Sequence, residues 1–148
     1  MRLTSRLKTR RVELTALSDT ELERRIAEEP DAHMQKALAE MLALCRERPA
    51  ARLWCTEWRI ARRDGVPVGS LCFKGPPAGG EVEIGYGVDE AYRGQGYATE
   101  AVRAAVNWAF YSSADLYYIT AETEEGNAAS RAVLEKLGFA PAGRGTEG

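Results

Sequence analysis

Six consecutive residues combine glycine, arginine and a helix start in a way that could bind an anion. They are, in order, Arg93, Gly94, Gln95, Gly96, Tyr97 and Ala98. A strand-like run ends just before them at Val88, and a helix-like run begins at about Ala98. The first N–H groups of a helix lack partners within the helix, and its dipole makes this end partly positive. Glycines let the backbone approach an anion closely, and Arg93 adds a charged donor. The segment therefore predicts a phosphate site that would suit a pyrophosphate.

Two other phosphate-binding patterns fit this segment less well. The P-loop requires G-x-x-x-x-G-K-[ST], and the chain contains no Gly-Lys-Ser or Gly-Lys-Thr. The dinucleotide fingerprint needs a third small residue where Thr99 stands, and it belongs to the first βα turn of a doubly wound sheet. Glycines that only shape a tight loop are the remaining alternative, but the flanking strand and helix favour anion binding.

The elements that position this turn can be predicted from hydrophobic periodicity. Ser18 and Glu21 form a capping box before a helix, and Gly138 is expected to end the last helix. Alternating residues predict a mostly antiparallel meander, followed by a helix that crosses over to a parallel strand. Strands are expected at residues 7–17, 54–60, 66–73, 81–88 and 116–121, and helices at 18–28, 34–45, 98–110 and 127–137. Another extended piece is expected from Phe139 onward.

Composition predicts one domain spanning residues 1–148. The chain is 45% hydrophobic with a formal net charge of −2, so no global field indicates a nucleic acid or an anionic membrane as partner. No apolar run approaches the roughly 20 residues that span a bilayer, and a cytoplasmic location is expected. Cys45, Cys55 and Cys72 lack C-x-x-C spacing, which favours buried reduced thiols over disulfides or a zinc site.

Two motifs resemble those of the GNAT N-acetyltransferase superfamily, and in particular its ribosomal-protein-alanine-acetyltransferase-like branch. Arg93, Gly96 and Ala98 match R/Q-x-x-G-x-G/A, and residues 127–139 are similar to N-x-x-S…LEKLGF. The resemblance implies an α/β (α+β) fold with a mixed, mostly antiparallel sheet and helices on both faces. It also implies a cofactor cleft where the strand ending at Val88 splays from residues 116–121.

The resemblance implies that acetyl-CoA is the acyl donor. Its pantetheine would pair with backbone near Val88, and its pyrophosphate would lie on the N–H groups of residues 94–98. Asn127 and Ser130 match family positions that face the pantetheine arm and the thioester. For Asn127 an N-cap is an equal and compatible alternative, and for Ser130 the alternative is a surface hydroxyl.

Transfer of an acetyl group to a primary amine by direct attack needs a base, because an alkylammonium is almost wholly protonated near pH 7. Glu83 matches an acidic position of the family and alternates with Val82 and Ile84, so it is the first candidate. Glu81 shares its face and is the reserve, and a solvated rim carboxylate is the alternative reading of Glu83. Ser130, or a nearby tyrosine such as Tyr86, is the candidate acid.

The sequence leaves the acceptor open between a small-molecule amine and a protein N-terminus. A non-catalytic acyl-CoA-binding or sensing domain is the rival function, because it would need the phosphate turn but no base. Family members usually continue past the Leu-Gly-Phe segment with two strands, whereas nine residues follow Phe139. We therefore expect a short or missing final strand and an open edge at residues 116–121. Either a homodimer covers this edge, or the chain is a shortened form that is less stable than its parent.

Overall fold

Six strands form one sheet in the order in which they occur in the chain, in a computed structural model that describes residues 5–122 and 127–140. All neighbours are antiparallel except β5 and β6, which are parallel, as expected for a crossover. The strands are β1 (Arg6–Lys8), β2 (Val12–Ala16), β3 (Glu57–Arg62), β4 (Pro67–Phe73), β5 (Glu81–Val88) and β6 (Tyr118–Thr120). The helices are α1 (Asp19–Glu28), α2 (Ala32–Glu47), α3 (Tyr97–Ser112) and α4 (Ala128–Lys136), with the short 3₁₀ helices η1 (Pro49–Trp54) and η2 (Glu90–Tyr92).

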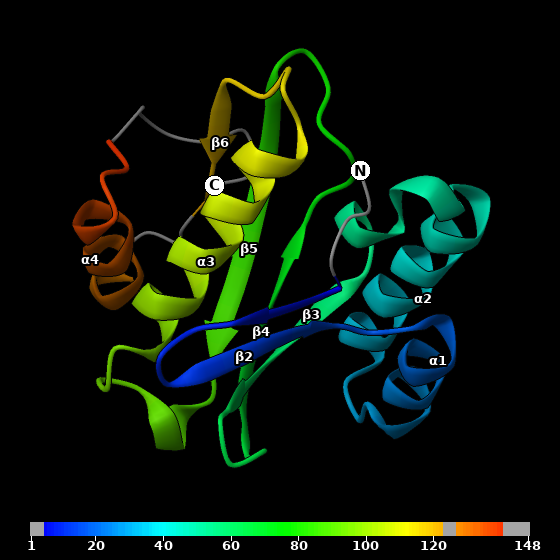
Figure 1. Cartoon of the computed structure of the whole chain (residues 1–148). Helices are drawn as coiled ribbons and strands as arrows, with labels where there is room; N and C mark the ends of the chain where they lie inside the picture. Colours follow the sequence, from blue (N-terminus) through cyan, green and yellow to red (C-terminus); the bar gives the residue numbers. More distant parts are fainter. Residues whose placement is uncertain (1–4, 123–126, 141–148) are drawn as a thin grey trace.

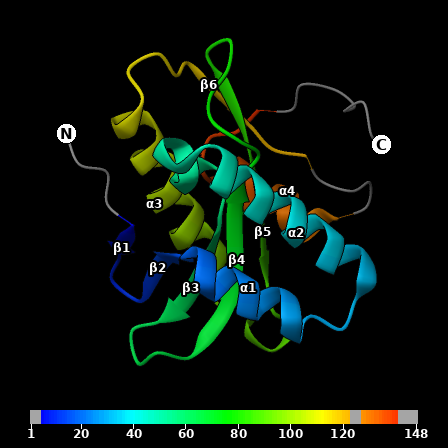
Figure 2. The same ribbon diagram turned by 90° about the vertical axis from the view of Figure 1, so that its right-hand side faces the viewer.

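Helices cover both faces of this sheet, as the sequence predicts. α1 and α2 lie on one side, and α3 and α4 lie on the other (Figures 1 and 2). The larger hydrophobic cluster lies between one face of the strands β2, β3, β4 and β5 and the inner side of α3. Within the described residues, no helix is both long enough and apolar enough to cross a membrane.

Four aromatic rings form the centre of the larger cluster. Trp54, Trp58, Phe73 and Trp108 pack with ring centroids 4.6 to 5.6 Å apart. The indole Nε1 of Trp58 donates to the carbonyl oxygen of Leu53 at 2.9 Å, so its polar atom is paired although the side chain is buried. Trp54 and Trp58 are therefore core residues.

A second, smaller cluster fixes α1 and α2 to the body of the molecule. It consists of Leu17, Leu22, Leu38, Leu42, Cys45 and Cys55. All three cysteines are free thiols; Cys72 is half-buried. The capping box of Ser18 and Glu21 is confirmed: the side chain of each accepts from the backbone N–H of the other.

The single strand predicted over residues 7–17 is wrong, because the chain turns back there to form the hairpin of β1 and β2. Thr9 closes the turn: its N–H donates to the Val12 carbonyl at 2.8 Å, and its hydroxyl bonds the same residue. In this hairpin Leu7 pairs with Leu14. In one continuous strand Leu7 and Leu14 would face opposite sides, so the change from odd to even apolar positions was a signal for the turn.

The strand predicted from Trp54 begins later, at Glu57. Trp54 instead ends η1, which Pro49 starts, and the N–H groups of Cys55 and Thr56 both bond the carbonyl of Arg52. β6 is also shorter than the predicted 116–121, because Leu116 packs in the main cluster instead of pairing in the sheet. In both cases the sequence predicts a strand at residues that are buried in the core but do not pair in the sheet.

The ends of α4 agree with the sequence prediction. Gly138, at φ +92°, follows the helix, and the N–H of Phe139 bonds the carbonyl of Leu134 at 2.9 Å. The expected short strand after Phe139 lies largely outside the described residues.

Candidate functional site

The N-terminus of α3 differs from those of the other three α-helices in the described part of the chain. Ser18, Asp31 and Asn127 each cap their helix with a side-chain oxygen that accepts from a first-turn N–H. α3 has Gly96 at this position, at φ +83°, and no side chain caps it. The first N–H groups of α3 therefore remain available to an outside acceptor.

Residues 93–96 form an exposed turn that leads from the end of β5 to α3. Gly94 and Gly96 both take positive φ angles, +77° and +83°, and a Cβ atom on Gly94 would meet no atom within 4 Å. The Nε atom of Arg93 donates to the carbonyl oxygen of Val88 at 2.9 Å. Arg93 thus ties the turn to the strand end, and Gln95 is exposed beside it.

The β1–β2 hairpin holds this turn from the other side. Arg11 donates from Nη1 to the Gln95 carbonyl at 2.8 Å and from Nε to the Glu100 carboxylate at 2.8 Å, and its guanidinium lies 5.1 Å from the Tyr97 ring centroid. The second carboxylate oxygen of Glu100 accepts from the Arg11 N–H at 2.7 Å and from the Thr9 hydroxyl. We call Thr9, Arg11 and Glu100 the hairpin clamp.

The carboxyl group of Glu100 is strongly perturbed by this clamp. Partial burial raises its pKa, but the hydrogen bonds from Thr9 and Arg11 and the charge of Arg11 outweigh burial and lower the pKa from 4.5 to about 2. Glu100 is therefore ionised throughout the physiological range. Sequence analysis missed the clamp, because its two halves lie more than eighty residues apart.

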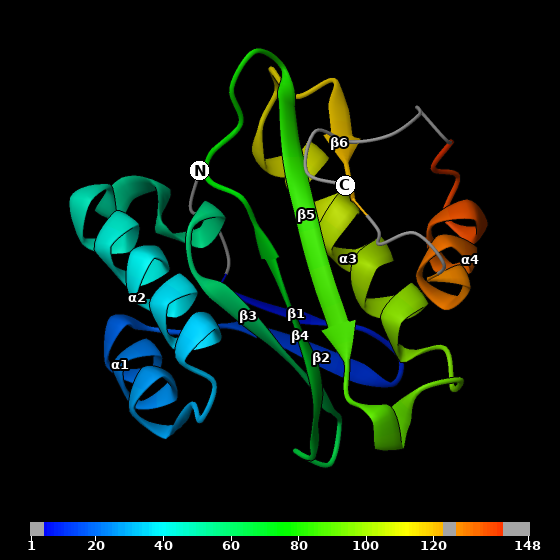
Figure 3. The ribbon, with the colours of Figure 1, turned by 180° about the vertical axis from the view of Figure 1, so that it is seen from behind.

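β5 and β6 pair only over a short stretch and then part. Their register runs from Glu81 with Tyr118 to Glu83 with Thr120, whereas β5 stays paired with β4 up to Val88. No described residue pairs with the β6-facing edge of β5 beyond Glu83, and Figure 3 shows β6 beside one half of β5. The strands thus separate on the approach to the Arg93–Ala98 turn.

Two predicted candidates for the acid meet where β5 faces α4. The Tyr86 hydroxyl lies 3.0 Å from the Ser130 carbonyl and 2.9 Å from the Ser130 Oγ atom. Burial raises the pKa of Tyr86, although the bond to Ser130 opposes this, so the phenol keeps its proton at neutral pH. Asn127 accepts from the Ser130 N–H at 3.1 Å, which confirms the N-cap. Ser130 is not a free surface hydroxyl.

Glu83 lies at the last pairing position of β5 with β6, on the sheet face opposite the main core. Its backbone carbonyl accepts from the Lys74 N–H at 2.9 Å, while its half-buried carboxylate has no ion pair or hydrogen bond with any described residue. Glu81, two residues earlier, is exposed. The alternation on this strand follows the sequence prediction.

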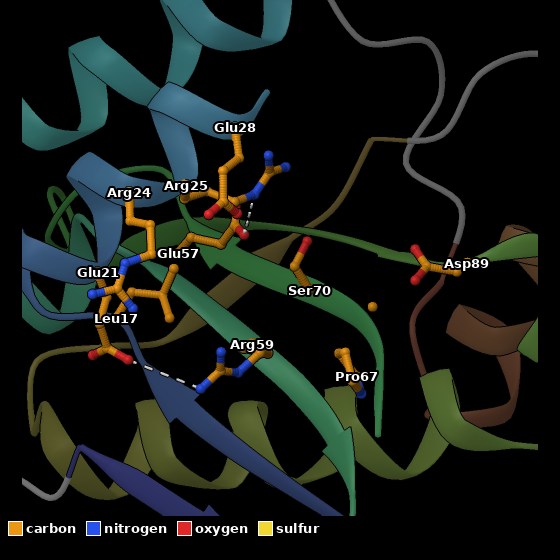
Figure 4. A pocket seen from close by; sticks show the side chains of 11 residues that line it. Leu17, Glu21, Arg24, Arg25, Glu28, Glu57, Arg59, Pro67, Ser70 and Asp89 are labelled. Carbon is orange, nitrogen blue, oxygen red and sulfur yellow. Dashed lines mark hydrogen bonds and ion pairs between the residues drawn. The ribbon is translucent and has the colours of Figure 1, made fainter. Parts of the chain in front are cut away.

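A pocket of about 350 Å³ lies between α1 and the same polar face of the sheet (Figure 4). Glu57, on β3, contributes to its lining and is only 9% exposed, with its carboxylate 3.4 Å from the Nε atom of Arg25. Burial raises the pKa of Glu57 and outweighs the opposing effect of Arg25. Sequence analysis missed this pocket, because the packing of α1 creates it.

The family model of the acetyltransferase (GNAT) domain matches residues 6–140 of the chain. YjdG of Bacillus subtilis, an uncharacterized N-acetyltransferase, is 39% identical over 84 residues, which are 55% of this chain and 49% of that protein. The match thus spans about half the length of this curated relative.

Solved structures share the fold over most of the chain. An acetyltransferase of the GNAT family from Bacillus anthracis superposes with a TM-score of 0.66 at 20% identity, over 93% of this chain and 85% of that one. RimJ of Mycobacterium smegmatis, solved in complex with CoA-disulfide, superposes with a TM-score of 0.64 at 25% identity, over 89% and 71% of the two chains. A ribosomal-protein-S5-alanine acetyltransferase from Vibrio fischeri superposes with a TM-score of 0.69 at 18% identity, over 93% of this chain and 84% of that one, so the expected branch is represented among the structural neighbours. With a family model that matches almost the whole chain, the protein belongs to the GNAT acetyltransferase family.

Proposed function

We propose that this protein is an N-acetyltransferase that moves an acetyl group from acetyl-CoA to a primary amine. The observation that carries the proposal is the uncapped N-terminus of α3, which follows a two-glycine turn beside the separating strands β5 and β6. Free helix N–H groups next to an open strand edge suit a ligand with a pyrophosphate at one end and an amide-bearing arm at the other. Membership of the family supports the same donor.

The proposed cofactor contacts follow the chain through this turn. The N–H groups of residues 94–98, Gln95 and Tyr97 included, donate to the oxygens of the pyrophosphate, with Arg93 as a further, charged donor. The pantetheine arm pairs with the free edge of β5 near Val88. Asn127 contributes by starting α4 at the place where Ser130 meets Tyr86.

In the proposed mechanism the acceptor nitrogen attacks the thioester carbonyl directly. Because Glu83 lies five residues before Val88 on β5, it takes the proton from the amine through intervening water, and a backbone N–H near Val88 stabilises the oxyanion. The carbon–sulfur bond then breaks, and the departing thiolate takes a proton from the hydroxyl of Tyr86 or of Ser130, whose oxygens lie 2.9 Å apart. The hydroxyl that donates regains its proton from solvent. A thiolate of pKa near 8.5 also leaves without help, so this last transfer contributes least.

The acceptor is proposed only as a class, a small-molecule amine or a protein N-terminus. The three free thiols agree with a reducing compartment such as the cytoplasm, which we propose as the location. A domain that only binds acyl-CoA would share the turn, and it would release no free CoA when amines are added.

The proposal is tested by thermal unfolding with millimolar acetyl-CoA and by titration of the ligand. Binding to the native state alone adds about 2.7 kcal/mol at a hundredfold excess over Kd, so the Tm should rise. Gly94→Val should weaken binding about tenfold or more, because its side chain projects into the proposed phosphate site.

Gly65→Val is the matched control for this variant. Gly65 also has a positive φ, +94°, and open space where a Cβ would lie, but it belongs to the β3–β4 turn. It should cost comparable stability and leave the affinity for acetyl-CoA unchanged. Gly96 is a poorer test, because a Cβ there would lie 2.9 Å from Arg11 Nη2. A Tm that acetyl-CoA does not change would refute the proposed function.

A further inference from the structure

The pocket between α1 and the polar face of the sheet has an excess of negative charge. Four carboxylates and three guanidinium groups line it: Glu21, Glu28, Glu57, Asp89, Arg24, Arg25 and Arg59. The arginines are already engaged by acids. The Nη2 atom of Arg59 lies 3.9 Å from a carboxylate oxygen of Glu21, and the charge of Arg24 also helps to lower the pKa of that carboxyl group. A pocket with surplus carboxylates attracts a cation.

Glu57 is the only buried one of these seven groups, and it shares its cation with another carboxylate. Arg25 reaches Glu57 at 3.4 Å, but it also pairs with Glu29 at 3.3 Å, so two carboxylates share one guanidinium. A charge that is nine-tenths buried with half a partner is costly. A second cation in the pocket would remove this cost, whereas an anion would increase it.

The pocket also extends to the end of β5, where the chemistry is proposed. Its lining includes Gly69 and Ser70 of β4 and Asp89, the residue after Val88. Gly69 cannot carry a side chain, because its Cβ would lie 2.2 Å from the Gly87 carbonyl oxygen, and Gly87 has open space beside it. At Gly69 the lining is therefore backbone, and the side chains of Ser70 and Asp89 are the polar groups on this part of the pocket.

We propose that this pocket holds the acceptor, and that the acceptor carries a second positive charge which pairs with Glu57 while its reacting amine lies at the end of β5. The inference rests on the proposed acetyltransferase function. Glu57 is level with Gly85 across β4, three residues before Val88 at the end of β5. The two ends of such an acceptor are therefore two strand spacings apart across the sheet and three residues apart along it, which is about 14 Å. An aliphatic diamine of about ten carbons has roughly this reach.

Three matched ten-carbon amines test the inference: 1,10-diaminodecane, decylamine and 10-aminodecanoate. They share the reacting amine and differ only in whether the far group is cationic, apolar or anionic. Release of free CoA thiol from acetyl-CoA should show a kcat/KM for the diamine about tenfold or more above that of the other two, mainly through KM. Glu57→Gln should abolish this preference.

Glu29→Gln is the matched control. It also removes one carboxylate partner of Arg25, but Glu29 does not line the pocket, so the preference for the diamine should persist. Burial already disfavours the charged form of Glu57, so Glu57→Gln should unfold at the wild-type Tm or above it at neutral pH.

The outcomes separate this inference from the function on which it rests. If acetyl-CoA does not raise the Tm, the proposed function fails. If acetyl-CoA binds but decylamine or 10-aminodecanoate equals the diamine, if none of the three is acetylated, or if Glu57→Gln keeps the preference, the function survives and the inference is overturned.

Discussion

Two glutamates on one face of the sheet have different surroundings and therefore different proposed tasks. Glu83 is half-buried and free of described partners, while Glu57 is buried and shares Arg25 with Glu29. The alternation on β5 was sufficient to predict the orientation of Glu83. The burial of Glu57 was not predictable from its own strand, because α1 covers it.

Glu83→Gln should lower kcat by about a hundredfold while the affinity for acetyl-CoA stays near that of the wild type, because an amide cannot take the proton from the amine. Steady-state kinetics and ligand titration check the two parts separately. Glu81→Gln, on the same face but exposed, is the matched control and should keep most of the activity. If Glu83→Gln turned over at the wild-type rate, the general base would be Glu81 or solvent instead of Glu83.

At the scale of the element, the phosphate turn depends on a hairpin far away in the sequence. The turn itself was readable, because its glycines, arginine and helix start are consecutive. The clamp could not be predicted, because Thr9 and Arg11 lie in a turn between β1 and β2, and the sequence predicted one continuous strand over residues 7–17 instead. Their partners are Gln95, in the turn before α3, and Glu100, in the first turn of α3. Local periodicity carries no information about such a contact.

Breaking the clamp should weaken acetyl-CoA binding without touching the proposed site. Arg11→Gln and Glu100→Gln should each reduce the affinity several-fold, by about 1 kcal/mol, because the Gln95 peptide is no longer held. Glu13→Gln is the control on the same hairpin, since it breaks a surface ion pair of 3.4 Å with Arg6. Equal affinities for acetyl-CoA in all three variants would show that the turn keeps its conformation without the clamp.

The clamp also predicts how stability depends on pH. The pKa of Glu100 is lowered from 4.5 to about 2 by folding, so its contribution to the free energy of unfolding is fully present above pH 4.5 and is lost as the pH falls from 4.5 towards 2. Urea unfolding of wild type and Glu100→Gln should therefore show a gap that is constant above pH 5 and narrows below it. A gap that stays constant down to pH 3 would contradict the role of the carboxylate.

At the scale of the whole molecule, the two proposed substrates approach from different sides. The cofactor turn and α4 belong to the side of α3, whereas the pocket belongs to the side of α1, and β5 is exposed to both (Figures 1 and 3). The meander, the crossover and the layers were predictable, because long periodic segments determine them. The short elements were less so, since β1, η1 and β6 depend on contacts that form only when the chain is folded.

The aromatic cluster gives the protein an unusual optical property. All three tryptophans of the chain, at positions 54, 58 and 108, lie in the larger cluster, and the smaller one contains none. Tryptophan emission therefore reports on the sheet and α3, while far-ultraviolet circular dichroism also records α1 and α2. Because the smaller cluster buries fewer residues, we expect the dichroism to begin to fall at lower urea concentration than the emission shifts to the red. Coincident curves would mean that both clusters unfold as one unit. Separate curves would mean that the two signals, without any added label, distinguish the unfolding of the smaller cluster from that of the larger one.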